Sequence, residues 1–149
     1  MQSKNRARVI WTALFVMWLC FVWGHSLVPA DASTEESSRF VFLVRPIFEL
    51  FNNHDEELMT FVIRKIAHFS EYVVLMALAL QCFRSWEIGR PKMMWALLVV
   101  WVCVPAIDET IQGFVPERDP RVMDVLIDMS GGMLGMAISH KLRITKGAK

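Results

Sequence analysis

Long, uninterrupted runs of apolar residues constrain this chain more than any other feature of its sequence. The first run extends from Val9 to Leu27 and follows the cations Lys4, Arg6 and Arg8. A helix of this length measures about 28 Å, which is close to the hydrocarbon thickness of a bilayer. Such runs are typical of membrane proteins, whereas a surface helix of a soluble protein has an apolar stripe with a helical period. We therefore expect the first run to form a transmembrane helix.

A cleaved signal peptide is the alternative for this first segment. Ala30-Asp31-Ala32 has the small-x-small form of a cleavage site. The apolar core of a signal peptide is only about 7–15 residues long, however, which is shorter than the run found here. The length of the run therefore favours a retained helix.

Two further apolar runs, Tyr72–Phe83 and Met93–Ile107, are each too short to cross a membrane by themselves. Their helices must continue into neighbouring polar residues, which are Lys65, His68 and Glu71 in the second helix and Asp108, Glu109 and Gln112 in the third. Pro105 lies just before the acidic pair and predicts a kink, because proline removes a helical hydrogen bond. We thus expect charged groups inside the membrane region, where such groups are costly and are usually paired or functional.

Local signals predict where the second and fourth helices begin. Asn53 followed by Glu56 has the spacing of a capping box, which predicts the start of the second helix. Asp119 is a preferred N-cap residue, and Pro120 suits the first helical position, so the fourth helix is predicted to begin there. The fourth helix is expected to end near His140.

The segment between the first two long helices, residues 31–53, is polar at its start and then amphipathic. Its apolar side chains recur at steps of three and four residues, and they are Phe40, Leu43, Val44, Ile47, Phe48 and Phe51. This spacing gathers them on one helical face, as in a helix that lies in the membrane interface, and Pro46 predicts a bend in it. Packing of the same face against the other helices explains the pattern equally well.

Together these segments predict an all-α integral membrane protein with a single domain over residues 1–149. It has four transmembrane helices, over about 9–28, 58–83, 93–115 and 120–140, and an interfacial amphipathic helix between the first and the second. Both termini and the loop before the third helix are rich in Lys and Arg, whereas every acidic residue except Glu87 lies at the other side. The positive-inside rule then places both termini in the cytoplasm.

Charge and cysteine content exclude several other classes of protein. The net charge is +1 and the cations lie at the ends of segments, so a basic nucleic-acid-binding surface is not expected. Cys20, Cys82 and Cys103 all fall in apolar runs at unrelated spacings. We interpret them as packing residues rather than as a disulfide framework or a zinc site.

In this predicted topology, the polar residues of each helix lie at the end of the helix that faces the outside of the cell. The candidate pocket residues are Lys65, His68, Glu71, Tyr72, Asp108, Glu109, Gln112, Arg118, Asp124 and Asp128. Residues three or four apart share a helical face, so each helix presents its polar group as one stripe. We expect them to form an outward-facing polar pocket. Below Asp128 the same face continues as Gly131 and Gly135, widened by Gly132, which predicts close packing with another helix.

A purely structural charge network is the alternative to a pocket, because an unpaired charge at mid-membrane costs about 2.5–3.5 kcal/mol. The carboxylates of the third and fourth helices face only two or three cations, however, which is more charge than pairing alone requires; these four carboxylates are Asp108, Glu109, Asp124 and Asp128. His68, Glu71, Asp108, Glu109 and Asp124 together offer oxygen-rich ligands for a divalent metal ion. No fixed-spacing metal motif is present, so neither a metal nor another cofactor is expected.

Enzymatic activity is left open by the sequence. His68 or Glu109 has the chemistry of a general base, but no nucleophile motif such as GxSxG occurs, and no catalytic residue is assigned. His25, His54 and His140 are interpreted as surface or interfacial histidines. A transporter is less favoured, because four spans would suffice for transport only in an oligomer.

Several of these residues resemble the signature of the VanZ-like membrane proteins. The matching pieces are His68-Phe69-x-x-Tyr72, Asp108-Glu109-x-x-Gln112-x-Phe114, Pro116-x-Arg118, Asp124, and Gly131 with Gly135. The resemblance extends over about residues 64–139, and in the first helix it is limited to an apolar run with Ser26 near its outer end. Family members commonly have Gly where this chain has Glu117, and often Asn where it has Asp128.

The resemblance implies a bacterial multi-pass protein of the cytoplasmic membrane and cell envelope. The namesake of the family is linked to low-level resistance to teicoplanin, a lipid-bearing glycopeptide antibiotic that acts outside this membrane. The expected partners are the lipid bilayer and an amphipathic or lipid-linked envelope molecule, and an oligomer is compatible with the sequence. A membrane-embedded hydrolase or transferase acting on lipid-linked cell-wall material is the alternative function.

Overall fold

Helices form nearly all of this protein. The structure, a computed structural model, describes the backbone of residues 2–147 and the side chains of residues 2–141. Its four long helices are α1 (Gln2–Ser26), α4 (Glu56–Ser85), α5 (Arg90–Gln112) and α6 (Val122–Gly147), and no strand occurs among the described residues. Each of the four is long and apolar enough to cross a membrane, α6 over Val122–Lys141. The predicted all-α class is therefore confirmed, and four helices have the length and apolar character that a membrane span requires.

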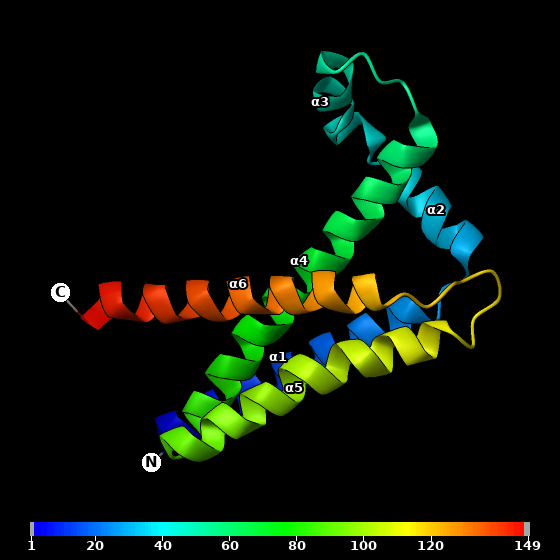
Figure 1. Cartoon of the computed structure of the whole chain (residues 1–149). Helices are drawn as coiled ribbons and strands as arrows, with labels where there is room; N and C mark the ends of the chain where they lie inside the picture. The colour runs from blue at the N-terminus through cyan, green and yellow to red at the C-terminus, as the bar shows by residue number, and fades with distance from the viewer. Residues whose placement is uncertain (1, 148–149) are drawn as a thin grey trace.

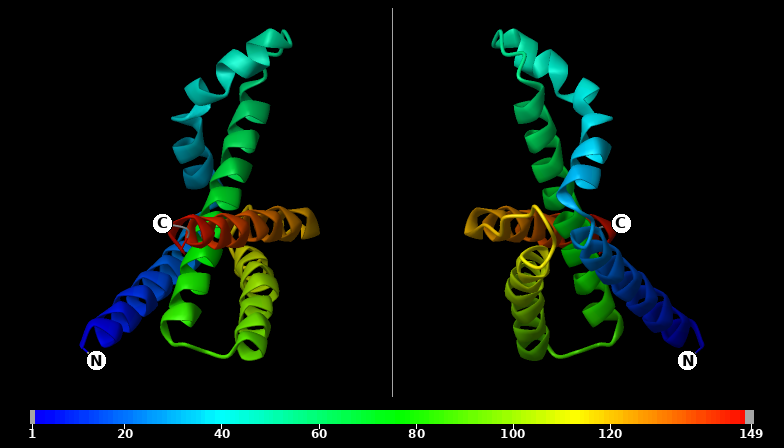
Figure 2. Two further views of the ribbon diagram at one scale, coloured as in Figure 1. Left: turned by 90° about the vertical axis from the view of Figure 1, so that its left-hand side faces the viewer. Right: turned by 90° about the vertical axis from the view of Figure 1, so that its right-hand side faces the viewer.

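The long helices cross one another rather than forming a parallel bundle (Figure 1). α6 crosses α4 near the middle of α4, whereas α1 and α5 lie beside the later half of α4, as the turned views also show (Figure 2). The N-terminus and the turn at 86–89 lie at one side of the molecule, and the loop at 113–121 lies at the opposite side. Lys4 Nζ and Arg8 Nη2 lie 2.6 and 3.4 Å from the carboxylate of Glu87, which ties the start of α1 to the 86–89 turn.

Apolar packing between α1, α4 and α5 supports the region next to the candidate pocket. Val22, Tyr72, Leu75 and Val104 form one buried cluster in which all three helices take part. Because the Tyr72 ring is 1% exposed, the apolar core reaches directly to the polar residues of α4. The pocket residues on α4 and α5 thus extend from a packed core.

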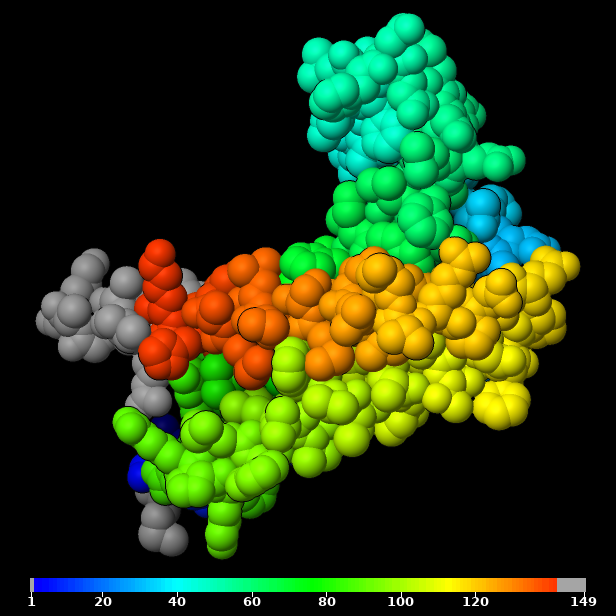
Figure 3. Space-filling model, viewed as in Figure 1, coloured from blue at the N-terminus to red at the C-terminus, as the bar shows by residue number. Residues whose placement is uncertain are grey.

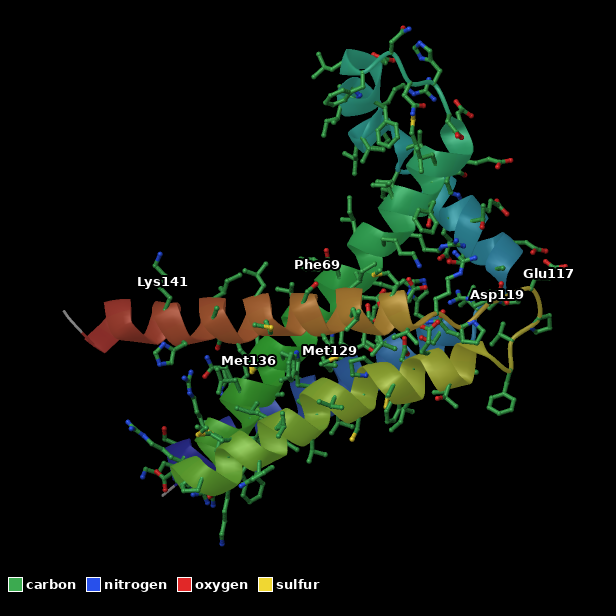
Figure 4. The ribbon with its side chains drawn as sticks, in the orientation of Figure 1. Phe69, Glu117, Asp119, Met129, Met136 and Lys141 are labelled. Carbon is green, nitrogen blue, oxygen red and sulfur yellow. The ribbon has the colours of Figure 1, made fainter. Side chains whose placement is uncertain are left out.

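The crossing of α4 and α6 depends on glycine. A Cβ atom at Gly131 would collide with the carbonyl oxygen of Phe69, and one at Gly135 would collide with the carbonyl oxygen of Val73. Figure 4 shows Phe69 on α4 at this crossing. The two helix backbones approach closely because these positions of α6 carry no side chain. The space-filling view shows α6 lying across α4 and against α5 (Figure 3).

Two predicted helix starts were wrong by a few residues. The N-cap of α4 is Asp55, whose side chain accepts a hydrogen bond from the backbone N–H of Leu58 at 3.0 Å. Asn53 instead accepts a bond from the N–H of Asp55, before the helix begins. α6 begins at Val122, so that Asp119 and Pro120 lie in the preceding loop. Glu109 of α5 accepts a hydrogen bond from the backbone N–H of Arg121 in their place.

The third long helix reaches the polar residues as predicted. α5 continues through Pro105 to Asp108, Glu109 and Gln112 without a break. It ends at Gln112 rather than near residue 115, and the chain then turns. The acidic pair therefore occupies the last turns of α5.

Three short helical pieces replace the single amphipathic helix predicted between α1 and α4. They are α2 (Ala30–Ser38), a 3₁₀ turn η1 (Val41–Leu43) and α3 (Arg45–Leu50). Pro46 stands at the start of α3 and begins a new helix instead of bending one, because proline fits the first turn. The pieces project from the bundle beside the first turns of α4 (Figure 1).

The apolar face of this segment is divided between the core and the surface. Val44 packs with Val41 against Met59 and Ile63, and Phe48 lies partly buried against the same cluster. The other members of the predicted face are exposed, and they are Phe40, Leu43, Ile47 and Phe51. The proposal that this exposed part lies in a membrane interface stays a prediction.

Candidate functional site

The predicted pocket residues come from α4, α5, α6 and the 113–121 loop. Figure 1 shows the end of α5 and the start of α6 at the side of this loop. α4 supplies Lys65, His68, Glu71 and Tyr72, and α5 supplies Asp108, Glu109 and Gln112. Asp124 and Asp128 come from the first turns of α6, and Arg118 comes from the loop. The contacts below divide this group into a buried part and a cavity at its mouth.

Asp108 is the most deeply buried carboxylate of the group and is 0% exposed. Ser26 Oγ, at the end of α1, donates a hydrogen bond to its Oδ1 at 2.5 Å. Gln112 Nε2, one turn further along α5, donates to its Oδ2 at 3.2 Å. Both donors are neutral, so they fix the position of the carboxylate without cancelling a negative charge.

Glu71 is paired with a histidine that we interpreted from the sequence as a surface or interfacial residue. The Glu71 Oε1 atom lies 2.8 Å from His25 Nδ1, and the His25 ring stacks on the His68 ring with centroids 6.0 Å apart. His25 is partly exposed and also takes part in the site, whereas His54 and His140 are exposed. A lone histidine at a helix end has no partner at a recognisable helical spacing, so the sequence did not predict this contact. Its neighbour Ser26 is the residue of this helix that the family resemblance includes.

Two further carboxylates, Asp124 and Glu109, bind groups on α4 and in the loop before α6. Lys65 Nζ lies 2.5 Å from Asp124 Oδ2, which is an ion pair between half-buried side chains. Glu109 Oε1 accepts a hydrogen bond from the backbone N–H of Arg121 at 2.5 Å. An acidic group at this place is favourable, because the first N–H groups of a helix lack intrahelical partners and carry partial positive charge. Glu109 thus provides, from α5, the capping contact that Asp119 was predicted to make.

Several buried polar atoms have no hydrogen-bond partner among the described residues. They are the Tyr72 hydroxyl, Asp128 Oδ1, Glu71 Oε2, Glu109 Oε2, Trp23 Nε1, and the Nε and Nη2 atoms of Arg118. Buried polar groups are normally satisfied, so each unsatisfied one requires an explanation. Most of these atoms belong to the site, and they include both acceptors and donors.

A cavity of about 180 Å³ lies at the mouth of the site. Four basic side chains line it, namely Arg64, Lys65, Arg118 and Arg121. Three acidic ones do so as well, namely Glu117, Asp119 and Asp124. Of the predicted pocket residues, Lys65, His68, Gln112, Arg118 and Asp124 reach this cavity. Glu71, Tyr72, Asp108, Glu109 and Asp128 are not part of its lining.

A second, much smaller cavity of about 10 Å³ leads toward the buried residues. Lys65, His68, Gln112 and Asp124 line both cavities, and Asp128 lines only the small one. The mouth and the buried carboxylates are therefore neighbouring parts of one site. Sequence reasoning did not anticipate Arg64 and Arg121 in the lining, because the loop conformation and the first turns of α4 bring them there.

Two lining residues in the 113–121 loop have shifted pKa values. Burial lowers the pKa of the Arg118 guanidinium, although nearby Asp108 and Glu109 oppose this shift, and an arginine remains charged at neutral pH. A hydrogen bond with Asp31 of α2 raises the pKa of the Glu117 carboxyl. Glu117 also has a φ of 63°, in the left-handed region. Figure 4 shows Glu117 and Asp119 at the loop end of the site.

The arrangement offers two kinds of binding chemistry. The basic mouth is suited to an anionic group, because arginine and lysine donate charge-assisted hydrogen bonds. In the buried part, one ligand atom from each of His68, Asp108 and Asp128 lies within 4.8 Å of the other two, which is a possible metal-binding set. The metal ligands considered from the sequence included Glu71, Glu109 and Asp124. The structure brings Asp128, rather than these three, close to His68 and Asp108.

Comparison with known proteins places the chain in a family. The family model described as VanZ/LLP1 matches residues 11–143. The matched range begins in α1 and ends in α6, so it contains every residue of the candidate site. No curated protein and no solved structure matches the chain. Because the match spans most of the sequence, the protein belongs to the VanZ/LLP1 family.

Proposed function

We propose that this protein resides in the bacterial cytoplasmic membrane with both termini in the cytoplasm. Its polar pocket then opens at the outer face and binds the headgroup of an amphipathic or lipid-linked envelope molecule. Family membership is consistent with a cell-envelope protein. The four apolar helices support a multi-pass membrane location.

The mouth cavity carries this proposal. Arg118 is half-buried at its wall, and its Nε and Nη2 atoms have no hydrogen-bond partner among the described residues. Arg64, Lys65 and Arg121 line the same cavity. An unpaired guanidinium beside further cations favours an anionic ligand, because its planar fork matches the oxygens of a phosphate or carboxylate. We therefore expect a phosphate or another anionic group in the headgroup of the ligand.

Apolar surface next to the mouth supports an amphipathic rather than a fully polar ligand. Phe61 lines the cavity and is 38% exposed, and Phe114 in the adjacent loop is 86% exposed. Lipid chains could contact these rings while the headgroup occupies the cavity. Large apolar side chains rimmed by polar groups often mark such binding surfaces.

Binding of a polyprenyl phosphate by purified protein in detergent tests this proposal, with the uncharged polyprenol of the same length as control ligand. We expect the phosphate to bind more tightly than the alcohol. Arg118→Gln should weaken phosphate binding about tenfold or more, since a hydrogen bond to a charged group contributes about 1.5–3 kcal/mol. Arg39→Gln, which changes an exposed arginine that follows α2 and does not line the cavity, should bind as the unchanged protein does.

Two results would contradict the proposal. One is equal binding of the phosphate and the alcohol, and the other is phosphate binding that Arg118→Gln leaves unchanged. Either result, in folded protein, would favour a charge network with only a structural role. Expression in a bacterial host provides a cellular test with the same two variants. We propose that the protein lowers susceptibility to teicoplanin, and that Arg118→Gln abolishes this effect while Arg39→Gln retains it.

A membrane-embedded hydrolase or transferase is the second candidate function. The observation that favours it is the position of His68, which lines both cavities and so adjoins the mouth and the buried carboxylates. A general base at that point would lie next to a bound headgroup. Release of product from lipid-linked substrates, followed by mass spectrometry, separates this enzyme from a protein that only binds.

A further inference from the structure

Three helices each contribute one metal-binding side chain to the buried part of the site. These side chains are His68 of α4, Asp108 of α5 and Asp128 of α6, and their exposed fractions are 8%, 0% and 1%. One ligand atom from each lies within 4.8 Å of the other two. Around a tetrahedral ion with ligand distances of about 2.0–2.2 Å, neighbouring ligand atoms are about 3.4 Å apart, so side-chain movements of about an ångström would complete the geometry.

An unpartnered atom in this group indicates that a ligand belongs there. Asp128 Oδ1 is buried and has no hydrogen-bond partner among the described residues. The nearby Tyr72 hydroxyl is also buried and has no hydrogen-bond partner among the described residues. A carboxylate oxygen that is left unpaired in a membrane interior is unfavourable unless a cation or a proton is bound to it.

Two buried carboxylates of the site, Asp108 and Asp128, have neither an ion-pair partner nor a backbone N–H donor among the described residues. Glu71 is paired with His25, Asp124 with Lys65, and Glu109 with the N–H of Arg121. Asp108 receives hydrogen bonds only from neutral groups, and no described residue forms an ion pair with Asp128. Because the two remaining carboxylates carry two negative charges, one divalent cation would neutralise both.

The contacts of Asp108 are those of an oriented metal ligand. Ser26 Oγ and Gln112 Nε2 each donate one hydrogen bond to a different carboxylate oxygen. A carboxylate oxygen accepts at two lone pairs, so each still has one available for an ion. Donors behind a ligating carboxylate hold it in place and are a regular feature of metal sites.

We propose that His68, Asp108 and Asp128 bind one divalent transition-metal ion of the Mn²⁺ or Zn²⁺ type. One imidazole with two carboxylates suits such ions better than it suits Ca²⁺, which prefers oxygen ligands alone. Three protein ligands leave coordination positions free, as in catalytic metal sites. The small cavity lined by His68 and Asp128 shares lining residues with the mouth cavity, where the headgroup of the proposed function binds. The metal site stands on its own contacts and does not depend on the identity of that headgroup.

Titration of the purified, metal-free full chain with Mn²⁺ in detergent tests the proposal. Electron paramagnetic resonance should report about one bound ion per chain, with a pulsed-resonance signal from a directly coordinated imidazole nitrogen. Asp128→Asn and His68→Gln should each weaken Mn²⁺ binding at least about tenfold, since even supporting residues of metal sites contribute that much. Glu35→Gln, which changes an exposed carboxylate of α2 that lines neither cavity, should bind Mn²⁺ as the unchanged protein does.

The nitrogen signal keeps the test decisive if a substitution prevents folding, because it is measured on the unchanged chain. Absence of Mn²⁺ and Zn²⁺ binding by the unchanged protein would overturn the proposal and leave protonation to neutralise the carboxylates. Binding without a nitrogen signal, or binding that Asp128→Asn leaves intact, would overturn it as well and would indicate ions on surface carboxylates. Because no lipid is present in this titration, its failure is distinct from failure of the lipid-binding experiment.

Discussion

Asp108 illustrates which side-chain contacts of the site follow from sequence spacing. Its bond with Gln112 joins residues four apart on one helix, and this spacing already predicts a shared face. Its bond with Ser26 joins residues that are far apart in the chain, and only the packing of α1 against α5 creates it. Local contacts could therefore be predicted from the sequence, and contacts between helices could not.

The same limit explains the contacts that the sequence did not predict. His25 has no helical partner at a recognisable spacing, so its contact with Glu71 of α4 was missed. The cap of α6 was assigned to Asp119 from local preference, whereas Glu109 of another helix binds the Arg121 N–H. A cap provided by a neighbouring helix has no signature in the local sequence.

Glu117 gives a prediction at the level of a single residue. It has a φ of 63°, a backbone conformation that glycine adopts without strain and other residues disfavour. We expect Glu117→Gly to have a higher thermal unfolding midpoint in detergent than Glu117→Ala, by about 2–4 °C for a chain of this size. Both variants remove the carboxylate, so the comparison isolates the backbone effect. Equal midpoints would mean that the loop adopts another conformation.

Among the structural elements, the long helices were the most predictable. Apolar runs and the need to cross a membrane required α5 to include Asp108 and Glu109, and the structure has both in that helix. The segment before α4 was less predictable, because one amphipathic period fits either a continuous helix or several short ones. The different burial of Val44 and Phe51 depends on tertiary packing against Met59 and Ile63.

The crossing of α4 and α6 gives a prediction for helix packing. Gly135→Ala places a methyl group against the backbone of Val73, which cannot move aside as a flexible side chain could. We expect a destabilisation of about 1–3 kcal/mol, the usual cost of overpacking, measured by unfolding in detergent. Gly24→Ala is the matched control, since a Cβ there meets nothing within 4 Å and alanine favours the helix. Equal stability of the two variants would show that the helices do not cross this closely.

For the whole molecule, the orientation in the membrane is the property that most needs a direct test. The N-terminus and the 86–89 turn lie at one side, opposite the 113–121 loop. If the termini are cytoplasmic, a cysteine at Glu117 should react with a membrane-impermeant thiol reagent in intact cells, and one at Gly89 should react only after permeabilisation. Cys20, Cys82 and Cys103 are free and must first be replaced. The reverse labelling pattern would invert the proposed orientation and place the pocket at the cytoplasmic face.

The length of α4 has a consequence for how a ligand would reach the pocket. Its 30 residues make a helix of about 45 Å, whereas the hydrocarbon core of a bilayer is about 30 Å thick. Lys65 lies about 14 Å from the start of the helix, so in the proposed orientation, with Ser85 at the inner boundary, the mouth cavity would lie near the level of the outer lipid headgroups. A ligand anchored in that leaflet would arrive by lateral diffusion, and confinement to this thin layer raises its local concentration far above its bulk value. A modest intrinsic affinity would then be sufficient to keep the pocket filled.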